Sequence, residues 1–167
     1  SIKFIKAFDS KERRVSLKGE AYFEVAKNEN KPFIVESKGI ATKALGTIFN
    51  ISAYPDHDTM KISLFEGKVE IQNPTKEKLP ILLSPRKELQ VNIEQDSYTK
   101  SSFNPELVAG WKEGKLVFDN ANFQEVKVTL ERWFGVGIRI KGKKPNDWKV
   151  STIYEKESLK NILTDLQ

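Results

Sequence analysis

Apolar and polar residues alternate one by one along much of the first part of the chain. Ala21, Phe23 and Val25 alternate with Tyr22 and Glu24, and residues 47–54 alternate in the same way. Successive side chains of a β-strand point to opposite faces, so this pattern predicts strands with one buried and one exposed face. The pattern supplies no catalytic chemistry, which favours a binding or scaffolding domain.

Turn residues divide residues 1–100 into short strand candidates, with glycine at three expected corners: Gly19, Gly39 and Gly46. The candidates are Arg13–Leu17, Ala21–Ala26, Phe33–Glu36, Ile40–Leu45, Thr47–Tyr54, Thr59–Phe65, Lys68–Gln72, Leu79–Leu83 and Lys87–Ile93. Many short strands with closely spaced turns are typical of all-β folds. We predict a mainly β protein whose residues 1–100 form an antiparallel sandwich, roll or solenoid-like domain.

The alternation stops near residue 95, where Ser, Pro and Gly become frequent. We expect residues 101–114 to be a linker, with a short helical turn at 107–111. From Lys115 the period changes from two to that of a helix. Asn122 and Glu125 stand at capping-box spacing, and Gly135 is a natural helix stop. A helix is therefore expected between them.

Residues 115–167 then read as a small split β-α-β-β-α module. Its strands are predicted at 116–118, 136–140 and 148–154, and its second helix begins at Ser158. The module would close with one more strand, so we expect it to be truncated at its C-terminal strand.

Composition narrows the function classes. The chain has 167 residues, a net charge of +5 and no cysteine, so no disulfide framework or cysteine-based zinc site is available. No apolar run approaches the roughly 20 residues needed to span a bilayer. Lysines are scattered among glutamates, which favours a solvated surface or an acidic protein partner over a phosphate track. We expect no nucleic-acid partner.

Candidate catalytic and metal-binding residues have ordinary structural explanations. Asp56, His57 and Asp58 are adjacent in a turn-like segment, and no second histidine exists to complete a metal shell. Glu20 and Glu24 share a strand face like a glycosidase pair, but a surface role is favoured. We predict no enzyme activity, no metal site and no cofactor.

The β segments resemble the core signature of the FecR-like anti-sigma factors. The resemblance rests on several motifs in the family's order: GEAYFEVA at 19–26, KPFIV at 31–35, LGTIFNISAY at 45–54 and LFEGKV at 64–69. The module that follows is similar to the family's C-terminal domain, a secretin-and-TonB short N-terminal-like fold, through WKEGKLVF at 111–118, LERWFGV at 130–136 and ESL at 157–159.

Two departures accompany the resemblance. The family's strand of the type LPDGS…LN, which precedes GEAYFEV, has no counterpart, so we expect the chain to be cut at both ends. Ser84-Pro85-Arg86 stands where the family usually writes Pro-Gly, which leaves the local turn geometry open.

The resemblance implies the periplasmic receiver of an inner-membrane-anchored anti-sigma factor. Such a receiver relays a signal from the N-terminal signalling domain of a TonB-dependent outer-membrane transporter to an extracytoplasmic-function sigma factor, which is held by a cytoplasmic segment absent from this chain. The alternative is a carbohydrate-binding or cell-envelope scaffolding β-module. An unpaired edge in the module also predicts homodimers by strand exchange.

The partner surface is predicted on the C-terminal module. Strand addition at residues 136–140 would supply backbone hydrogen bonds, and the cations would steer an acidic partner. The predicted partner-binding residues are Arg139, Lys141, Trp148, Lys149 and Tyr154.

Overall fold

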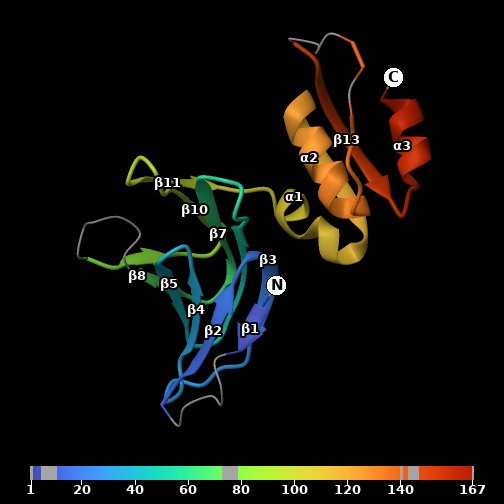
Figure 1. The fold of residues 1–167 in the computed structure, drawn as a ribbon. Coiled ribbons are helices and arrows are strands. Elements are labelled where there is room, and N and C mark those ends of the chain that lie inside the picture. The colour runs from blue at the N-terminus through green and yellow to red at the C-terminus, as the bar shows by residue number, and fades with distance from the viewer. Residues whose placement is uncertain (1, 5–10, 73–78, 140, 143–146, 167) are drawn as a thin grey trace. The chain divides into compact units, whose positions relative to one another are not determined.

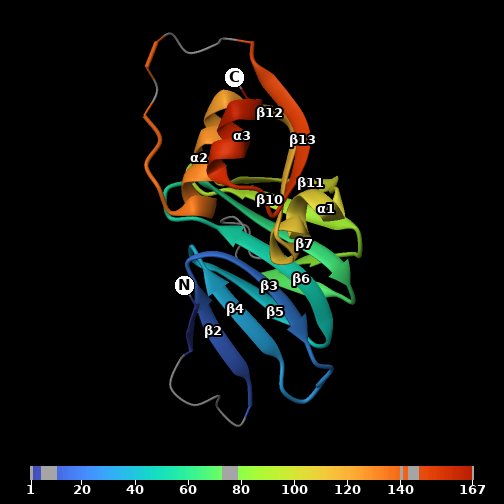
Figure 2. The ribbon, with the colours of Figure 1, turned by 90° about the vertical axis from the view of Figure 1, so that its right-hand side faces the viewer.

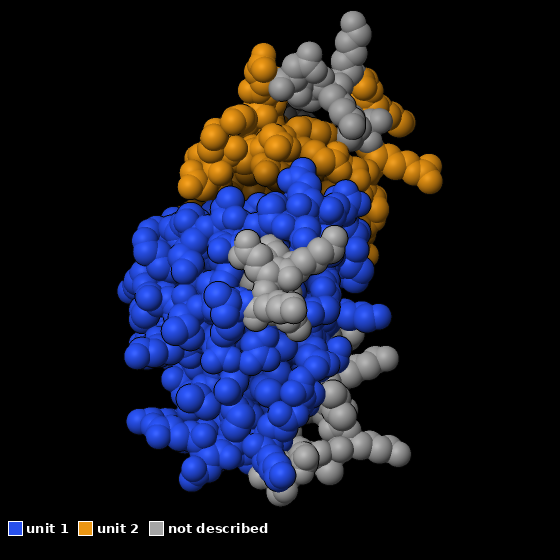
Figure 3. All heavy atoms as spheres, turned by 90° about the vertical axis from the view of Figure 1, so that its left-hand side faces the viewer, with its two compact units in different colours: residues 1–108 blue, residues 109–167 orange. Residues whose placement is uncertain are grey.

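The computed structural model describes residues 2–4, 11–72, 79–139, 141–142 and 147–166 (Figure 1). The chain divides into two compact units, residues 1–108 (unit 1) and 109–167 (unit 2), which are coloured separately in Figure 3. Unit 1 is built from strands and unit 2 combines strands with helices. The predicted fold class, mainly β with an α+β module, is confirmed.

Unit 1 contains two sheets. The first has the order β1 (Ile2–Phe4), β2 (Arg13–Leu17), β4 (Phe33–Ser37), β5 (Ile40–Ala44), β8 (Val69–Gln72), β9 (Ile81–Leu83). The second has the order β11 (Ser97–Ser102), β10 (Lys87–Asn92), β7 (Thr59–Glu66), β6 (Thr47–Ala53), β3 (Gly19–Val25).

Each strand candidate in residues 1–100 corresponds to an observed strand, with boundaries that differ by at most two residues at either end. The sequence analysis missed β1 and β11, and β11 occupies part of the region read as non-alternating. Pairing is antiparallel except between β2 and β4, which run parallel.

The core of unit 1 lies between the inward faces of the two sheets. Phe49, Ile51 and Ile62 are fully buried there, and the ring of Phe23 stacks on that of Phe49 with centroids 5.0 Å apart. Complete burial of such side chains contributes about 1.5–3 kcal/mol each, so this core is the main source of stability in unit 1.

One glycine shows how closely two backbone segments approach at the turn between β7 and β8. Gly67 has φ +84°, and a Cβ there would lie 2.5 Å from the carbonyl oxygen of Gly46. Both the left-handed backbone and the close approach exclude a side chain. The β7–β8 turn therefore requires glycine at this position.

The structure shows the geometry of the turn at Ser84-Pro85-Arg86, which the sequence left open. Arg86 adopts φ +65°, the left-handed conformation that a Pro-Gly turn provides without strain. Its N–H donates to the Leu64 carbonyl at 2.8 Å, which fixes the chain beside β7. The turn therefore places a non-glycine residue in the left-handed region.

Unit 2 contains β12 (Lys115–Asn122), α2 (Phe123–Phe134), β13 (Lys149–Glu155) and α3 (Leu159–Asp165). The short helices α1 (Pro105–Ala109) and η1 (Gly110–Glu113) precede β12, where a helical turn was expected. In Figure 2 the strands β12 and β13 lie side by side with α2 and α3 next to them. The small core contains Leu116, Phe118, Ala121, Val126, Leu130 and Ile162.

The predicted strand at residues 136–140 is wrong over its described part. Residues 136–139 belong to no strand, and residue 140 lies outside the described residues. The observed order is β-α-β-α, and the sheet formed by the described residues of unit 2 contains only β12 and β13. The alternation of Val136, Ile138 and Ile140 resembled a strand, but of the two described residues Ile138 packs against the core and Val136 is exposed.

Among the described residues, no helix has the length and apolar content needed to cross a lipid bilayer.

Candidate partner-binding surface of the C-terminal unit

The capping box predicted at the start of α2 is present and sets the direction of the helix. Asn122 Oδ1 accepts from the backbone N–H groups of Gln124 at 2.9 Å and Glu125 at 3.1 Å. Glu125 Oε2 accepts from the N–H of Asn122 at 2.8 Å. Three backbone donors that a helix leaves unpaired are thereby satisfied, so α2 begins directly at the end of β12.

Glu131, near the end of α2, holds the segment that follows the helix. Its Oε1 accepts from Lys127 Nζ at 2.7 Å and from the backbone N–H of Ile138 at 2.8 Å. The hydrogen bond from Lys127 and then that from Ile138 lower the pKa of Glu131 below its ordinary value. Ile138 is therefore tied to α2 rather than to a neighbouring strand, which explains why the predicted strand does not form.

Tyr154 on β13 connects the sheet to α3. Its hydroxyl donates to Asp165 Oδ2 at 2.5 Å, and its ring meets that of Phe118 edge-to-face at 6.3 Å between centroids. Burial, followed by the hydrogen bond to Asp165, raises the pKa of Tyr154 to about 12. The structure thus places this predicted partner residue in the packing of unit 2.

Trp148 also turns toward the interior of unit 2. It is half-buried at the margin of the core and its ring meets that of Phe123 edge-to-face at 5.8 Å between centroids. Phe123 is the first residue of α2, so Trp148 joins the start of β13 to the start of the helix. Most of this ring is occupied by intramolecular packing.

The three predicted cations are on the surface. Arg139, Lys141 and Lys149 are all exposed, and we call them the basic surface. Lys143 and Lys144, which the sequence groups with them, lie outside the described residues. Exposed cations attract an acidic partner over a distance of about 8–10 Å at ordinary salt, so they act mainly on the rate and selectivity of association.

A row of residues on β13 was missed by the sequence analysis. Lys149, Ser151, Ile153 and Glu155 alternate with half-buried neighbours and share the exposed face of the strand. Ile153 is 50% exposed, which is unusual for a β-branched residue in the middle of a strand. The alternation of residues 149–155 is the sequence signal that marks this face.

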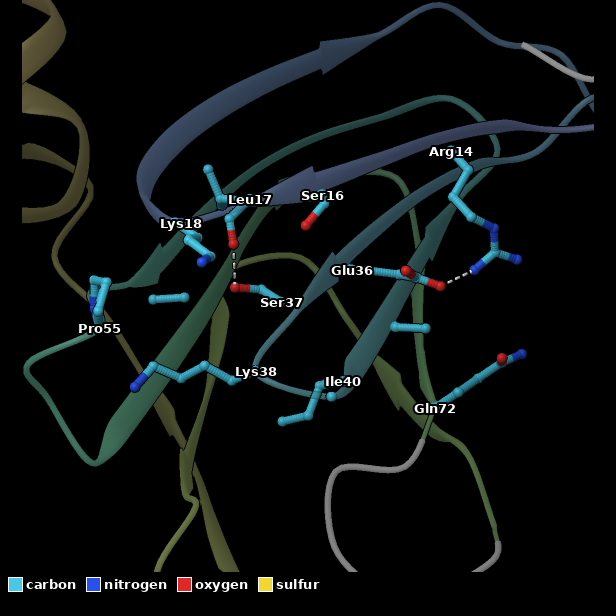
Figure 4. A pocket seen from close by; sticks show the side chains of 13 residues that line it. Arg14, Ser16, Leu17, Lys18, Glu36, Ser37, Lys38, Ile40, Pro55 and Gln72 are labelled. Carbon is cyan, nitrogen blue, oxygen red and sulfur yellow. Dashed lines mark hydrogen bonds and ion pairs between the residues drawn. The ribbon is translucent and has the colours of Figure 1, made fainter. Parts of the chain in front are cut away.

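Unit 1 contains a hollow of about 680 Å³ beside β2 and β4 (Figure 4). Several of its polar groups are bonded to protein neighbours. Arg14 pairs with Glu12 at 2.6 Å and with Glu36, and Ser37 donates to the Leu17 carbonyl at 2.8 Å. The hydrogen bond to Glu12 raises the pKa of Arg14 further. These three side chains of the hollow are therefore engaged within unit 1.

The catalytic candidates of the sequence have structural roles in unit 1. Glu20 accepts from Asn50 Nδ2 at 2.8 Å and from the Tyr54 hydroxyl at 3.1 Å, whereas Glu24 is exposed. The backbone N–H of His57 donates to the Tyr54 carbonyl at 3.2 Å within the turn that follows β6. Within the described part of the chain, no three carboxylate or imidazole groups are placed to share a metal ion.

One pair is buried more deeply than the sequence suggested. Ser63 and Glu88 lie opposite each other on β7 and β10, and the Ser63 hydroxyl donates to Glu88 Oε2 at 2.6 Å. Lys61 Nζ lies 3.9 Å from the other oxygen of Glu88. A hydrogen bond and a nearby positive charge thus compensate the burial of the Glu88 carboxylate, which is explained by its role in the structure.

Two family models match the chain, one in its N-terminal part and one in its C-terminal part. One described as FecR protein matches residues 1–70, and one described as FecR, C-terminal matches residues 115–167. A comparison with curated proteins gave no match.

The chain is also similar to solved structures. A crystal structure of a "putative anti-sigma factor" from Parabacteroides distasonis ATCC 8503 is 28% identical, with a TM-score of 0.82 over 99% of this chain and 77% of the solved one. A second crystal structure under the same description has the same identity and TM-score and is covered over 76% of its length.

Proposed function

The chain belongs to the FecR-like anti-sigma factors, and from this premise we propose that it is the periplasmic receiving part of a membrane-anchored regulator. In this role it receives a signal from the N-terminal signalling domain of a TonB-dependent transporter. It passes that signal toward an extracytoplasmic-function sigma factor held by another part of the protein. The action is protein–protein contact, without catalysis.

The observation that carries the proposal is the order of the two FecR segments in one chain. The β unit and the α+β unit each match their own part of the family, and the chain is similar over 99% of its length to a protein described as an anti-sigma factor. A regulatory role in sigma-factor signalling follows from the family.

The basic surface of unit 2 is the proposed contact site. Arg139, Lys141 and Lys149 are exposed, so an acidic partner can approach them without disturbing the core. Trp148 and Tyr154 would support this surface from within, because they fix β13 to α2 and α3. The edges of the β12–β13 sheet, to which the described residues add no further strand, are where a partner strand could add, rather than residues 136–139.

A calorimetric titration of the chain with the isolated signalling domain of the transporter encoded beside it tests the proposal. We expect saturable one-to-one binding, weakened by at least about tenfold in the variant Arg139→Glu/Lys141→Glu because like charges then face an acidic partner. The melting temperature should not change, since both side chains are exposed.

The matched control is Lys11→Glu/Lys68→Glu, which makes the same change in net charge on exposed residues of unit 1. It should bind like the unchanged chain. Equal weakening in both variants would show a general charge effect and remove the basic surface from consideration. Absence of any binding by the unchanged chain would contradict the proposed partner.

A further inference from the structure

Strand β13 is an edge strand whose sequence is complementary in charge to itself. It reads Lys-Val-Ser-Thr-Ile-Tyr-Glu from Lys149 to Glu155, with a cation at one end and a carboxylate at the other on the same exposed face. On one side it pairs with β12, and the described residues place no strand on its other side. We propose that this edge pairs antiparallel with β13 of a second copy of the chain, which makes unit 2 a homodimerisation module.

The hydrogen-bonding phase of β13 shows which backbone groups point to the open edge. The N–H of Lys156 donates to the Gly114 carbonyl at 3.1 Å, and β12 and β13 are antiparallel with Leu116 opposite Tyr154. In an antiparallel ladder hydrogen-bonded pairs alternate, so Tyr154 and Thr152 bond to β12. The N–H and C=O groups of Ile153 and Glu155 therefore point outward.

One register satisfies these outward groups and the charges together. With Thr152 on the two-fold axis, Ser151 lies opposite Ile153 of the second copy, and Lys149 lies opposite Glu155 of the second copy. Each opposite-charge pair occurs twice because the axis repeats it. The outward backbone groups of Ile153 then meet those of Ser151 as a hydrogen-bonded pair.

The neighbouring register is worse. A shift of two residues toward the N-terminus places Glu155 opposite Asp147 of the second copy, and like charges directly opposite are destabilising. It also leaves Lys149 opposite an isoleucine. Lys149 and Glu155 are the only charged residues of β13, so the register centred on Thr152 is the one that pairs opposite charges within the strand.

The exposed apolar residues on this face also favour a second copy. Ile153 is 50% exposed and lies opposite Val117 across the β12–β13 pair. Pairing of two β13 strands makes a four-stranded sheet in which Ile153 is flanked on both sides. The dimer would cover an edge that natural proteins otherwise protect with bulges, proline or inward charge. This inference does not depend on the proposed function.

Charge reversal tests the pairing through complementation. We expect the unchanged chain to sediment as a concentration-dependent dimer. Lys149→Glu alone places Glu opposite Glu, and Glu155→Lys alone places Lys opposite Lys, so each variant should dissociate at least about tenfold more readily. An equimolar mixture of the two variants should return to a dimer, because every pair between them is again of opposite charge.

A thiol at the axis provides an independent readout. The chain has no cysteine, so Thr152→Cys introduces a single thiol. Residues facing each other at a non-hydrogen-bonded position have Cα atoms about 4.5 Å apart, within reach of a disulfide. We expect rapid oxidation to a covalent dimer. Ser101→Cys, on the exposed edge strand β11 of unit 1, is the matched control and should oxidise slowly.

The sedimentation and crosslinking results together decide whether β13 pairs with a second copy. Dimer loss in both single variants, its return in the mixture and selective crosslinking at position 152 support the inference. A chain that stays monomeric up to millimolar concentration overturns it, as does a mixture that remains monomeric while both variants keep their melting temperatures. Equal crosslinking at positions 101 and 152 would also overturn the proposed register.

Discussion

In unit 1 the strands of two sheets bury one face against each other, whereas in unit 2 a two-stranded sheet rests on helices and leaves its other face exposed. The inward residues of β6 and β7, such as Phe49 and Ile62, are fully buried. On β13 no residue is fully buried, and the pattern alternates between exposed and half-buried. The strands of unit 1 are thus covered more completely than those of unit 2.

The difference in burial means that the two units are stabilised in different ways. Unit 1 is held mainly by apolar burial, which is indifferent to pH. Unit 2 has a small core and depends more on directed contacts, such as Tyr154 with Asp165 and Glu131 with Ile138. A unit of this kind keeps exposed cations for the proposed partner and a strand edge for the proposed pairing with a second copy.

The largest expected effect tests whether unit 1 depends on its core. Phe49→Ala removes a ring that is fully buried and stacked on Phe23, so it should lower the free energy of unfolding of unit 1 by about 3–5 kcal/mol. Urea unfolding followed by circular dichroism measures this. Leu82→Ala, in the same unit but 65% exposed, is the control and should change stability by less than about 0.5 kcal/mol. Similar losses in both variants would contradict a core-dominated unit.

The second test concerns the contact between Tyr154 and Asp165 in unit 2. Tyr154→Phe removes one hydrogen bond to a carboxylate and should lower the stability of unit 2 by about 1 kcal/mol. The control Tyr98→Phe alters a tyrosine that is 40% exposed on unit 1. Thermal melts of the three proteins at neutral pH make the comparison.

The same residue predicts an alkaline limit to the stability of unit 2. The pKa of Tyr154 is raised from 10.0 to about 12, so its contribution is fully present below pH 10 and is lost as the pH rises through about 12. The Tyr154→Phe protein should lack this loss. An identical decline in both proteins between these pH values would assign the alkaline sensitivity to another group.

A smaller effect of opposite sign is expected in unit 1. Arg86 adopts φ +65°, which disfavours any residue with a Cβ, so Arg86→Gly should relieve strain and raise the stability of unit 1 by about 0.5–1 kcal/mol. Arg86→Lys keeps both the Cβ and the charge and should leave stability unchanged. A stabilisation of equal size in Arg86→Lys would refute the backbone explanation.

The smallest effect is local to unit 2. Glu131→Gln removes the ion pair with Lys127 and weakens acceptance from the Ile138 N–H, so amide exchange at Ile138 should accelerate while the core of unit 1 keeps its rate. Because the pKa of Glu131 is lowered from 4.5, its contribution is present above that pH and is lost as the pH falls through the lower folded value. Unchanged exchange at Ile138 in acid would contradict this clamp.

Much of unit 1 could be predicted from the sequence because strict alternation has one physical meaning. Ala21, Phe23 and Val25 fall on the buried or partly buried side as expected. Strand β11 escaped because all six residues of Ser97–Ser102 are exposed, so no apolar period marks it. An edge strand held by backbone pairing alone leaves little signal in hydrophobicity.

In unit 2 the local signals were reliable and the longer-range ones were not. Asn122, Glu125 and Gly135 delimit α2 as predicted, since capping depends on residues only a few positions apart. Residues 136–139 alternate like a strand, but the side chain of Glu131 holds Ile138 to the helix. Whether alternation becomes a strand depends on a partner strand, which the sequence does not identify.

The proposed receiving surface in unit 2 is tested most directly by hydrogen exchange of the chain with and without the transporter's signalling domain. The account predicts slower exchange in residues 136–139 and 147–155, with the strands of unit 1 unchanged. Protection confined to unit 1, for example along β11 or around the hollow beside β2 and β4, would place the partner on the other unit and contradict the account.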